Sequence, residues 1–139
     1  HYPLRRQRQM CIRDRLTTIA QRMRGMLRVD DVAARIGGDE FIVLVTGIDA
    51  TAALRLGEHL LRDASQPIAL ADGTRVSVGL SIGISIISAA NRSPQAALDS
   101  ADAALYRAKA RGGRCCEIVG GADVEDATLS RSNGEPATA

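Results

Sequence analysis

Three segments of the chain place apolar residues at intervals of three and four, the pattern of a helix with one buried face. These predicted helices are residues 16–27, 51–65 and 94–111. Asp49 or Thr51 can cap the second helix. Ser93 caps the third ahead of Pro94 at the first helical position, and Gly112-Gly113 ends it. The predicted inward positions are Leu16, Ile19, Ala20, Met23 and Leu27, then Ala53, Leu56, Leu60 and Ala64, and finally Ala97, Ala101, Ala104, Leu105 and Ala108.

Other segments alternate with a period of two or form short β-type runs. Residues 32–36 and 41–45 flank Gly37-Gly38-Asp39-Glu40, which predicts a hairpin because both glycines accept the positive φ of a tight turn. Residues 71–74 predict a turn that leads into one long strand over 76–86. One face of that strand is apolar and the other carries only Gly and Ser. The simplest partner for close packing on the Gly/Ser face is a helix, and a ligand is the less favoured alternative.

A closing strand at 115–119 completes an order of elements that predicts an α/β (α+β) sandwich. Its sheet is mixed and largely antiparallel, with helices packed on it. Residues 1–15 have neither periodicity and receive no predicted element. Residues 120–139 are small, polar and without pattern, which is typical of a disordered tail.

Composition narrows the classes of function for this 139-residue, single-domain chain. Aromatic residues make up 2%, so stacking on single-stranded nucleic acid is nearly unavailable. Eight arginines and one acid, Asp14, lie in the first 28 positions. Such a basic arm suits nucleic acid or a phosphate-rich surface, but no nucleic-acid motif accompanies it. We therefore interpret it as a solvated terminus and predict no nucleic-acid partner.

The three cysteines, Cys11, Cys115 and Cys116, lack the spacing of metal ligands or of a disulfide framework. They fit a reducing, cytoplasmic environment. The uncharged stretch at 76–90 has 15 residues, too few for a helix that spans a bilayer. A membrane-attached parent protein would therefore carry its anchor outside this sequence.

The predicted hairpin turn is the first candidate for chemistry. Two adjacent carboxylates, Asp39 and Glu40, follow two glycines whose main chain a ligand can approach. Mg²⁺ usually takes one or two protein carboxylates beside substrate phosphates, so this turn can hold a metal–nucleotide complex. The alternative from these residues alone is a solvent-exposed hairpin tip without a ligand.

A family resemblance favours the first interpretation. Residues 34–45 read ARIGGDEFIVLV and resemble the signature of the GGDEF family, the bacterial diguanylate cyclases. The segment 16–41 is similar to the helix and strand leading into that signature. Residues 76–85, VSVGLSIGIS, resemble the family's central strand, and 93–113 its "D-x-A-L-Y-x-A-K" helix. The resemblance covers residues 16–119 in the family's order.

The resemblance implies a signalling nucleotidyltransferase that joins two GTP molecules into cyclic di-GMP. Each subunit of a homodimer presents one GTP to the other, with Mg²⁺ or Mn²⁺ as cofactor. Gly37 and Gly38 match positions that lie against the nucleotide. Asp39 matches the metal-binding carboxylate that helps to deprotonate the 3′-hydroxyl, and Glu40 supports the same catalytic and metal site.

Further residues match the family's binding positions. Lys109, the chain's single lysine, matches a phosphate-contacting lysine, although a lysine at a helix C-terminus can also simply interact with the macrodipole. Arg114 stands one place after the family's phosphate-contacting arginine. Arg28 and Asp31 have the R-x-x-D spacing of the inhibitory product site, for which a surface ion pair is the alternative. Arg35 matches an arginine that we expect to be structural.

One part of the family's domain has no counterpart in this sequence. We find no counterpart of the family's N-terminal strand and helix, which supply a further metal-binding Asp and the residues that read guanine. The sequence therefore predicts a diguanylate cyclase domain that is incomplete in this chain. The alternatives are a non-catalytic module that binds cyclic di-GMP or GTP, and an inactive fragment.

Overall fold

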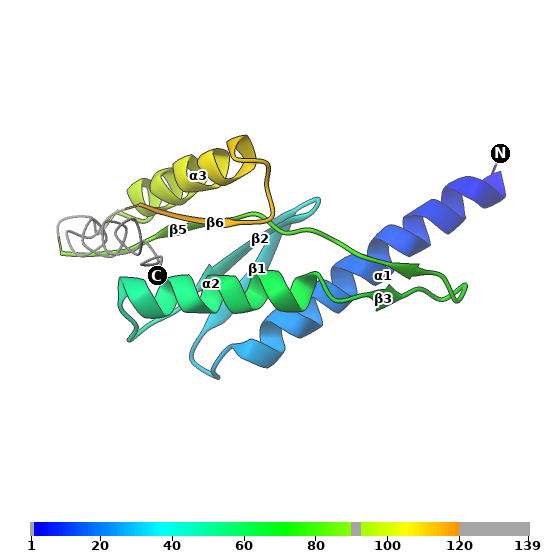
Figure 1. Cartoon of the computed structure of the whole chain (residues 1–139), viewed down its shortest axis with the longest axis horizontal. Coiled ribbons are helices and arrows are strands. Elements are labelled where there is room, and N and C mark those ends of the chain that lie inside the picture. The colour runs from blue at the N-terminus through cyan, green and yellow to red at the C-terminus, as the bar shows by residue number, and fades with distance from the viewer. Residues whose placement is uncertain (1, 90–92, 120–139) are drawn as a thin grey trace, which may run out of the picture. The chain divides into compact units, whose positions relative to one another are not determined.

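The computed structural model describes residues 2–89 and 93–119. They form two compact units, one holding the described residues up to Gly47 with His59–Leu80, the other Ile48–Glu58 with those from Ser81 onward. The first unit contains α1 (Tyr2–Met26), β1 (Val32–Gly37), β2 (Glu40–Leu44), β3 (Ile68–Ala69) and β4 (Arg75–Val76), labelled in part in Figure 1. The second contains β5 (Ile82–Ser85), α3 (Pro94–Ala110) and β6 (Cys116–Val119), and α2 (Ala50–Ala64) contributes to both.

Helix α1 is longer than its apolar pattern predicts. It begins at Tyr2, whereas we predicted no element over residues 1–15. That prediction was wrong because the segment is rich in Arg and Gln, which favour helix by intrinsic propensity without forming an apolar stripe. The stripe itself is confirmed from Leu16 onward, since Ile19 and Met23 are buried.

Strands β1 and β2 form the predicted antiparallel hairpin. Val32 lies opposite Leu44 and Arg35 opposite Phe41, and an irregularity then brings Gly37 opposite Glu40. Of the two glycines, only Gly38 has a positive φ, of 38°. The turn therefore uses the conformational freedom of glycine at one of the two positions that could accept a positive φ.

Helix α2 shows which capping residue the chain uses. The Asp49 carboxylate accepts a hydrogen bond from the Ala52 amide at 2.7 Å, so Asp49 rather than Thr51 is the cap. The end of α2 is held by Arg22 of α1, whose guanidinium donates to main-chain carbonyls of Asp63, Gln66 and Pro67 at 3.0, 2.8 and 3.0 Å. These contacts supply donors to main-chain carbonyls at the end of the helix, where intrahelical donors run out.

The predicted long strand over 76–86 is divided in the structure. β4 pairs antiparallel with β3 across the predicted turn, while β5 pairs in parallel with β6. Residues 77–81 belong to no sheet of the described chain, because a strand forms only where a partner satisfies its backbone groups. The α+β class and mainly antiparallel pairing are confirmed, but the pairs form three two-stranded sheets rather than one.

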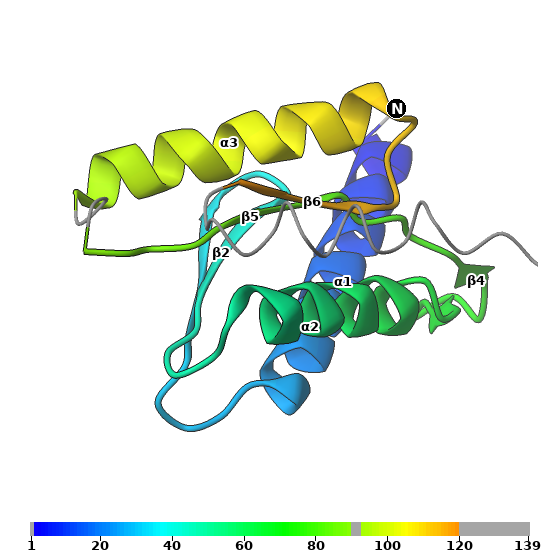
Figure 2. The same cartoon turned by 60° about the vertical axis from the view of Figure 1, so that its left-hand side comes forward.

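The second unit is built on β5, α3 and β6, with α3 packed along both strands (Figure 2). Ser93 caps α3 as predicted, accepting from the Ala96 amide at 3.4 Å. A Cβ at Gly83 would lie 2.2 Å from the Ala101 carbonyl oxygen and 2.4 Å from the Leu105 nitrogen. The predicted close approach of a helix to the Gly/Ser face is therefore confirmed. The predicted tail at 120–139 lies outside the described residues.

Candidate functional site

The glycine turn is open to an approaching molecule. Gly37, Gly38, Asp39 and Glu40 are all exposed, and a Cβ added to either glycine would meet no atom within 4 Å. Arg35 stabilises the turn, because its Nε donates a hydrogen bond to the Gly38 carbonyl at 2.8 Å. This contact supports the structural role expected of Arg35 and leaves the main chain of the turn accessible.

Asp39 and Glu40 offer a small set of oxygen donors. No group of three or more His, Cys, Asp or Glu side chains that could hold a metal ion is found in residues 2–89 and 93–119. Two exposed neighbouring carboxylates do not suit a structural zinc site, which needs four protein ligands. They do suit Mg²⁺, which retains water and takes further ligands from substrate phosphates.

The Arg28–Asp31 segment is a closed turn. The Arg28 amide donates to Asp31 Oδ2 at 2.8 Å, and the Asp31 amide donates to the Arg28 carbonyl at 3.1 Å. Among the described residues, no ion pair joins the Arg28 guanidinium to the Asp31 carboxylate, so the alternative interpretation as a surface ion pair does not hold. The carboxylate instead fixes the main chain of Arg28, whose side chain is exposed.

The end of α3 carries Lys109, which is exposed in the last helical turn. Gly113 donates to the Ala108 carbonyl at 3.0 Å and Gly112 to the Lys109 carbonyl at 3.1 Å, which is the Schellman arrangement. Gly112, directly after the helix cap, has the positive φ that this helix stop requires, 106°, and Gly113 has φ of 73°. The phosphate-binding and macrodipole interpretations of Lys109 both remain compatible with this position.

Arg114 follows the two glycines and is also left-handed, with φ of 56°. Its side chain is exposed, and its amide donates to Ser81 Oγ at 3.2 Å. A residue with a Cβ pays about 1–2 kcal/mol for this conformation. The loop that carries Arg114 is therefore held in a backbone state that the sequence pattern did not predict.

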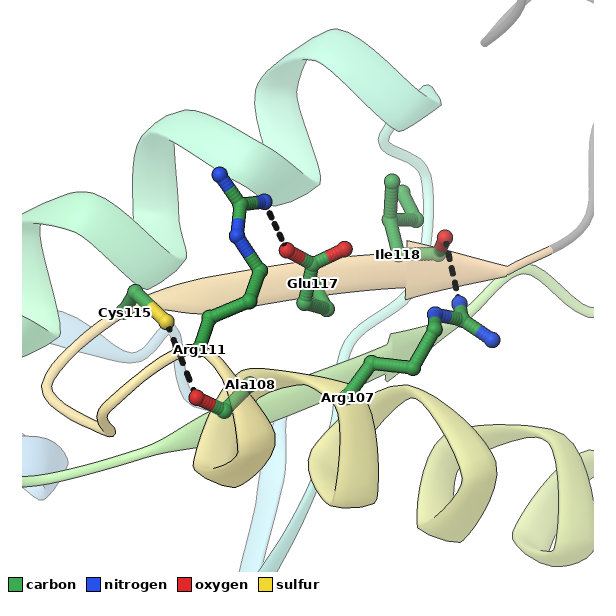
Figure 3. A network of polar contacts seen from close by, with 6 residues as sticks. All are labelled: Arg107, Ala108, Arg111, Cys115, Glu117 and Ile118. Carbon is green, nitrogen blue, oxygen red and sulfur yellow. Dashed lines mark hydrogen bonds and ion pairs between the residues drawn. The ribbon is translucent and has the colours of Figure 1, made fainter.

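A further polar network lies between α3 and β6 (Figure 3). Arg111 pairs with Glu117, Arg107 donates to the Ile118 carbonyl at 3.4 Å, and Cys115 Sγ donates to the Ala108 carbonyl at 3.3 Å. The hydrogen bond and charge of Glu117 raise the pKa of Arg111. These side chains come from separate elements, so no spacing in the sequence indicated their contacts.

The structure assigns the predicted site residues to two groups. Arg28, Asp31 and the glycine turn belong to the first unit, whereas Lys109 and Arg114 belong to the second. A shallow groove lies along α1, and it is lined by none of these residues. Among the described residues, no helix combines the length and the apolar character needed to cross a bilayer.

Comparison with known proteins gives consistent results. The family model described as "Diguanylate cyclase, GGDEF domain" matches residues 14–115. The diguanylate cyclase TpbB of Pseudomonas aeruginosa PAO1 is 45% identical over 102 residues, which are 71% of this chain and 23% of TpbB. The response regulator PleD of Caulobacter vibrioides is 34% identical over 99 residues, 70% of this chain and 22% of PleD. The chain thus spans about a quarter of the length of these relatives.

The fold is similar to solved GGDEF domains. A structure of TpbB from P. aeruginosa that comprises only the GGDEF domain has a TM-score of 0.72 and 36% identity. The similarity covers 85% of this chain and 67% of that domain.

Proposed function

Because this chain belongs to the GGDEF family of diguanylate cyclase domains, we propose that residues 16–119 contribute to the condensation of two GTP molecules into cyclic di-GMP. The observation that carries the proposal is the exposed Gly-Gly-Asp-Glu turn, whose main chain is open on both glycines. Two carboxylates stand directly beside this opening. That combination suits a phosphate group neutralised by a divalent ion.

The turn supplies positioning and charge. Gly37 and Gly38 allow the nucleotide to lie against the main chain, and Asp39 with Glu40 holds Mg²⁺ or Mn²⁺. The ion, when bound, neutralises phosphate charge and lowers the pKa of the attacking hydroxyl. The Asp39 carboxylate assists removal of the 3′-hydroxyl proton, the 3′-oxygen attacks the α-phosphorus of the partner GTP, and pyrophosphate leaves.

The two cations of the second unit bind phosphate in this proposal. Lys109 acts as a point charge on phosphate oxygens, and the planar guanidinium of Arg114 can donate two parallel hydrogen bonds. Both side chains are exposed, so each is available to a ligand.

Cyclic di-GMP has two phosphodiester bonds, each formed from a GTP, and a homodimer supplies one GTP from each subunit. The proposed GTP substrate supports a cytoplasmic location for this reaction.

Arg28 and Asp31 form the proposed inhibitory product site. The closed turn holds the Arg28 main chain while its guanidinium stays exposed, and a guanidinium can donate to both O6 and N7 of guanine. Isothermal calorimetry of the chain with cyclic di-GMP tests this role. We expect binding by the wild type and none by Arg28→Ala; equal binding by both would contradict the assignment.

Activity is tested on the product of the complete gene, incubated with GTP and Mg²⁺. We expect cyclic di-GMP by chromatography, and none from Asp39→Ala. Asp30→Ala is the matched control, because Asp30 is also exposed, lies in the same unit and is not one of the residues assigned to a site. Absence of product from the wild type, or full activity of Asp39→Ala, would refute the proposal.

A second candidate is a non-catalytic binding module. It is supported by the sequence analysis, which finds no counterpart of the family's N-terminal strand and helix, and this chain covers 67% of the TpbB GGDEF domain. This candidate predicts binding of cyclic di-GMP or GTP without product formation. A chain that binds neither and melts without a cooperative transition would be an inactive fragment instead.

A further inference from the structure

We propose that Ser81 is a positioning residue for Arg114: its hydroxyl oxygen holds the Arg114 main chain in the conformation that presents the guanidinium to phosphate. The inference rests on the proposed binding of GTP phosphate by Arg114. It goes beyond the resemblance, because it concerns how this chain orients an arginine that stands one place later than in the family pattern.

The loop after α3 is left-handed over three consecutive residues. Gly112, Gly113 and Arg114 have φ of 106°, 73° and 56°. Glycine adopts such values without steric cost, but the Cβ of Arg114 opposes them. The loop therefore needs a contact at Arg114 that the two glycines do not need.

Ser81 provides that contact from outside the α3 segment. The amides of Arg111, Gly112 and Gly113 all donate to carbonyls within α3, at 3.0 to 3.1 Å. The Arg114 amide instead donates a hydrogen bond to Ser81 Oγ, with a nitrogen–oxygen distance of 3.2 Å. Ser81 lies 33 positions earlier in the sequence. Removal of the Ser81 hydroxyl would leave the Arg114 amide without this acceptor.

The position of Ser81 is itself fixed by the neighbouring strand. Ile82, the next residue, donates its amide to the Cys115 carbonyl at 3.0 Å, and Cys115 directly follows Arg114. A Cβ on Gly113 would lie 3.1 Å from Ser81 Oγ, so the glycine leaves just enough space for the hydroxyl. The start of β5 and the loop are thus joined at two successive residues, one of them through Ser81.

The test separates positioning from general stability by a double-mutant cycle. The product of the complete gene is assayed as wild type, Ser81→Ala, Arg114→Ala and the double variant. We expect Ser81→Ala to raise the KM for GTP about fivefold, the effect of one lost hydrogen bond, with kcat within twofold. In the Arg114→Ala background, Ser81→Ala should have no further effect, because it acts through Arg114.

The control is Ser77→Ala, the same substitution at an exposed serine of the preceding segment, which should leave KM unchanged. A wild type without cyclase activity would contradict both the proposed function and this inference. An active wild type with unchanged KM in Ser81→Ala, or a further fivefold rise in the double variant, overturns the inference alone. One measurement needs no variant: the Arg114 amide should resist hydrogen exchange, and unprotected exchange would also overturn the inference.

Discussion

Replacing Gly83 by alanine tests the closest packing in the second unit. The added Cβ would lie 2.2 Å from the Ala101 carbonyl oxygen, 2.4 Å from the Leu105 nitrogen and 2.8 Å from the Leu105 Cβ. The two nearest atoms are helix backbone, which cannot rotate away as the end of a side chain can. Helix α3 would have to move from β5 by roughly 1 Å to restore an ordinary contact distance.

The expected cost follows from two opposing effects. Overpacking a close contact costs about 1–3 kcal/mol, and the backbone position of the obstacle puts Gly83 at the upper end of that range. Alanine also reduces the entropy of the unfolded chain, which returns about 0.4–1 kcal/mol. We therefore expect Gly83→Ala to lower the free energy of unfolding by about 2 kcal/mol.

Urea denaturation followed by circular dichroism measures this loss. With a slope of about 1–3 kcal/mol per molar urea, the midpoint should fall by roughly 1 M. Gly25→Ala is the matched control, because Gly25 lies in α1 with no atom within 4 Å of its ideal Cβ. That variant should gain up to about 1 kcal/mol from helix propensity. A Gly83→Ala midpoint at or above that of the wild type would refute the packing argument.

Three further predictions concern contacts within single units. Burial raises the pKa of Cys116 from an ordinary 9.0 to about 11, so the unfolded thiol ionises first and stability should fall as pH rises from about 9 to about 11. Urea midpoints across this range should fall more steeply for the wild type than for Cys116→Ala; parallel curves would contradict the shift. Arg22→Lys should lower stability by about 1–2 kcal/mol in urea titrations, because a single ammonium nitrogen cannot span the three carbonyls that two guanidinium nitrogens reach, whereas the exposed Arg24→Lys should change it little. Gly57→Ala places a Cβ 2.5 Å from Cys116 Sγ, so it should lower the melting temperature, and Cys116→Ala in the same chain should restore much of the loss. A double variant no more stable than Gly57→Ala would contradict that explanation.

Local chemistry was enough to predict several elements. Ser93-Pro94 gave the start of α3 and Gly112-Gly113 its end, because capping and helix termination depend on neighbouring residues. The Gly-Gly step gave the hairpin, and the small residue at Gly83 gave the close approach of a helix. The sequence also predicted the glycine turn that carries the two carboxylates.

The remaining features depend on partners distant in the chain. The alternating segment 76–86 could not reveal that its two ends pair with different strands, since periodicity describes a face and not a neighbour. Ser81 offered no signal as an acceptor for Arg114, because 33 residues separate them. Arg22 belongs to a polar helix face that looks solvated until the end of α2 is placed beside it.

The hairpin has a consequence for handling the protein. Within residues 2–89 and 93–119, β1 and β2 pair with each other alone, and Val32, Ile36 and Leu44 are 55%, 59% and 47% exposed. The run Phe-Ile-Val-Leu-Val at 41–45 has no charge, proline or glycine to discourage intermolecular β-pairing. Hairpins from separate molecules can extend one another's hydrogen-bond ladder. We therefore expect concentrated samples to become turbid while their circular dichroism still reports intact helices.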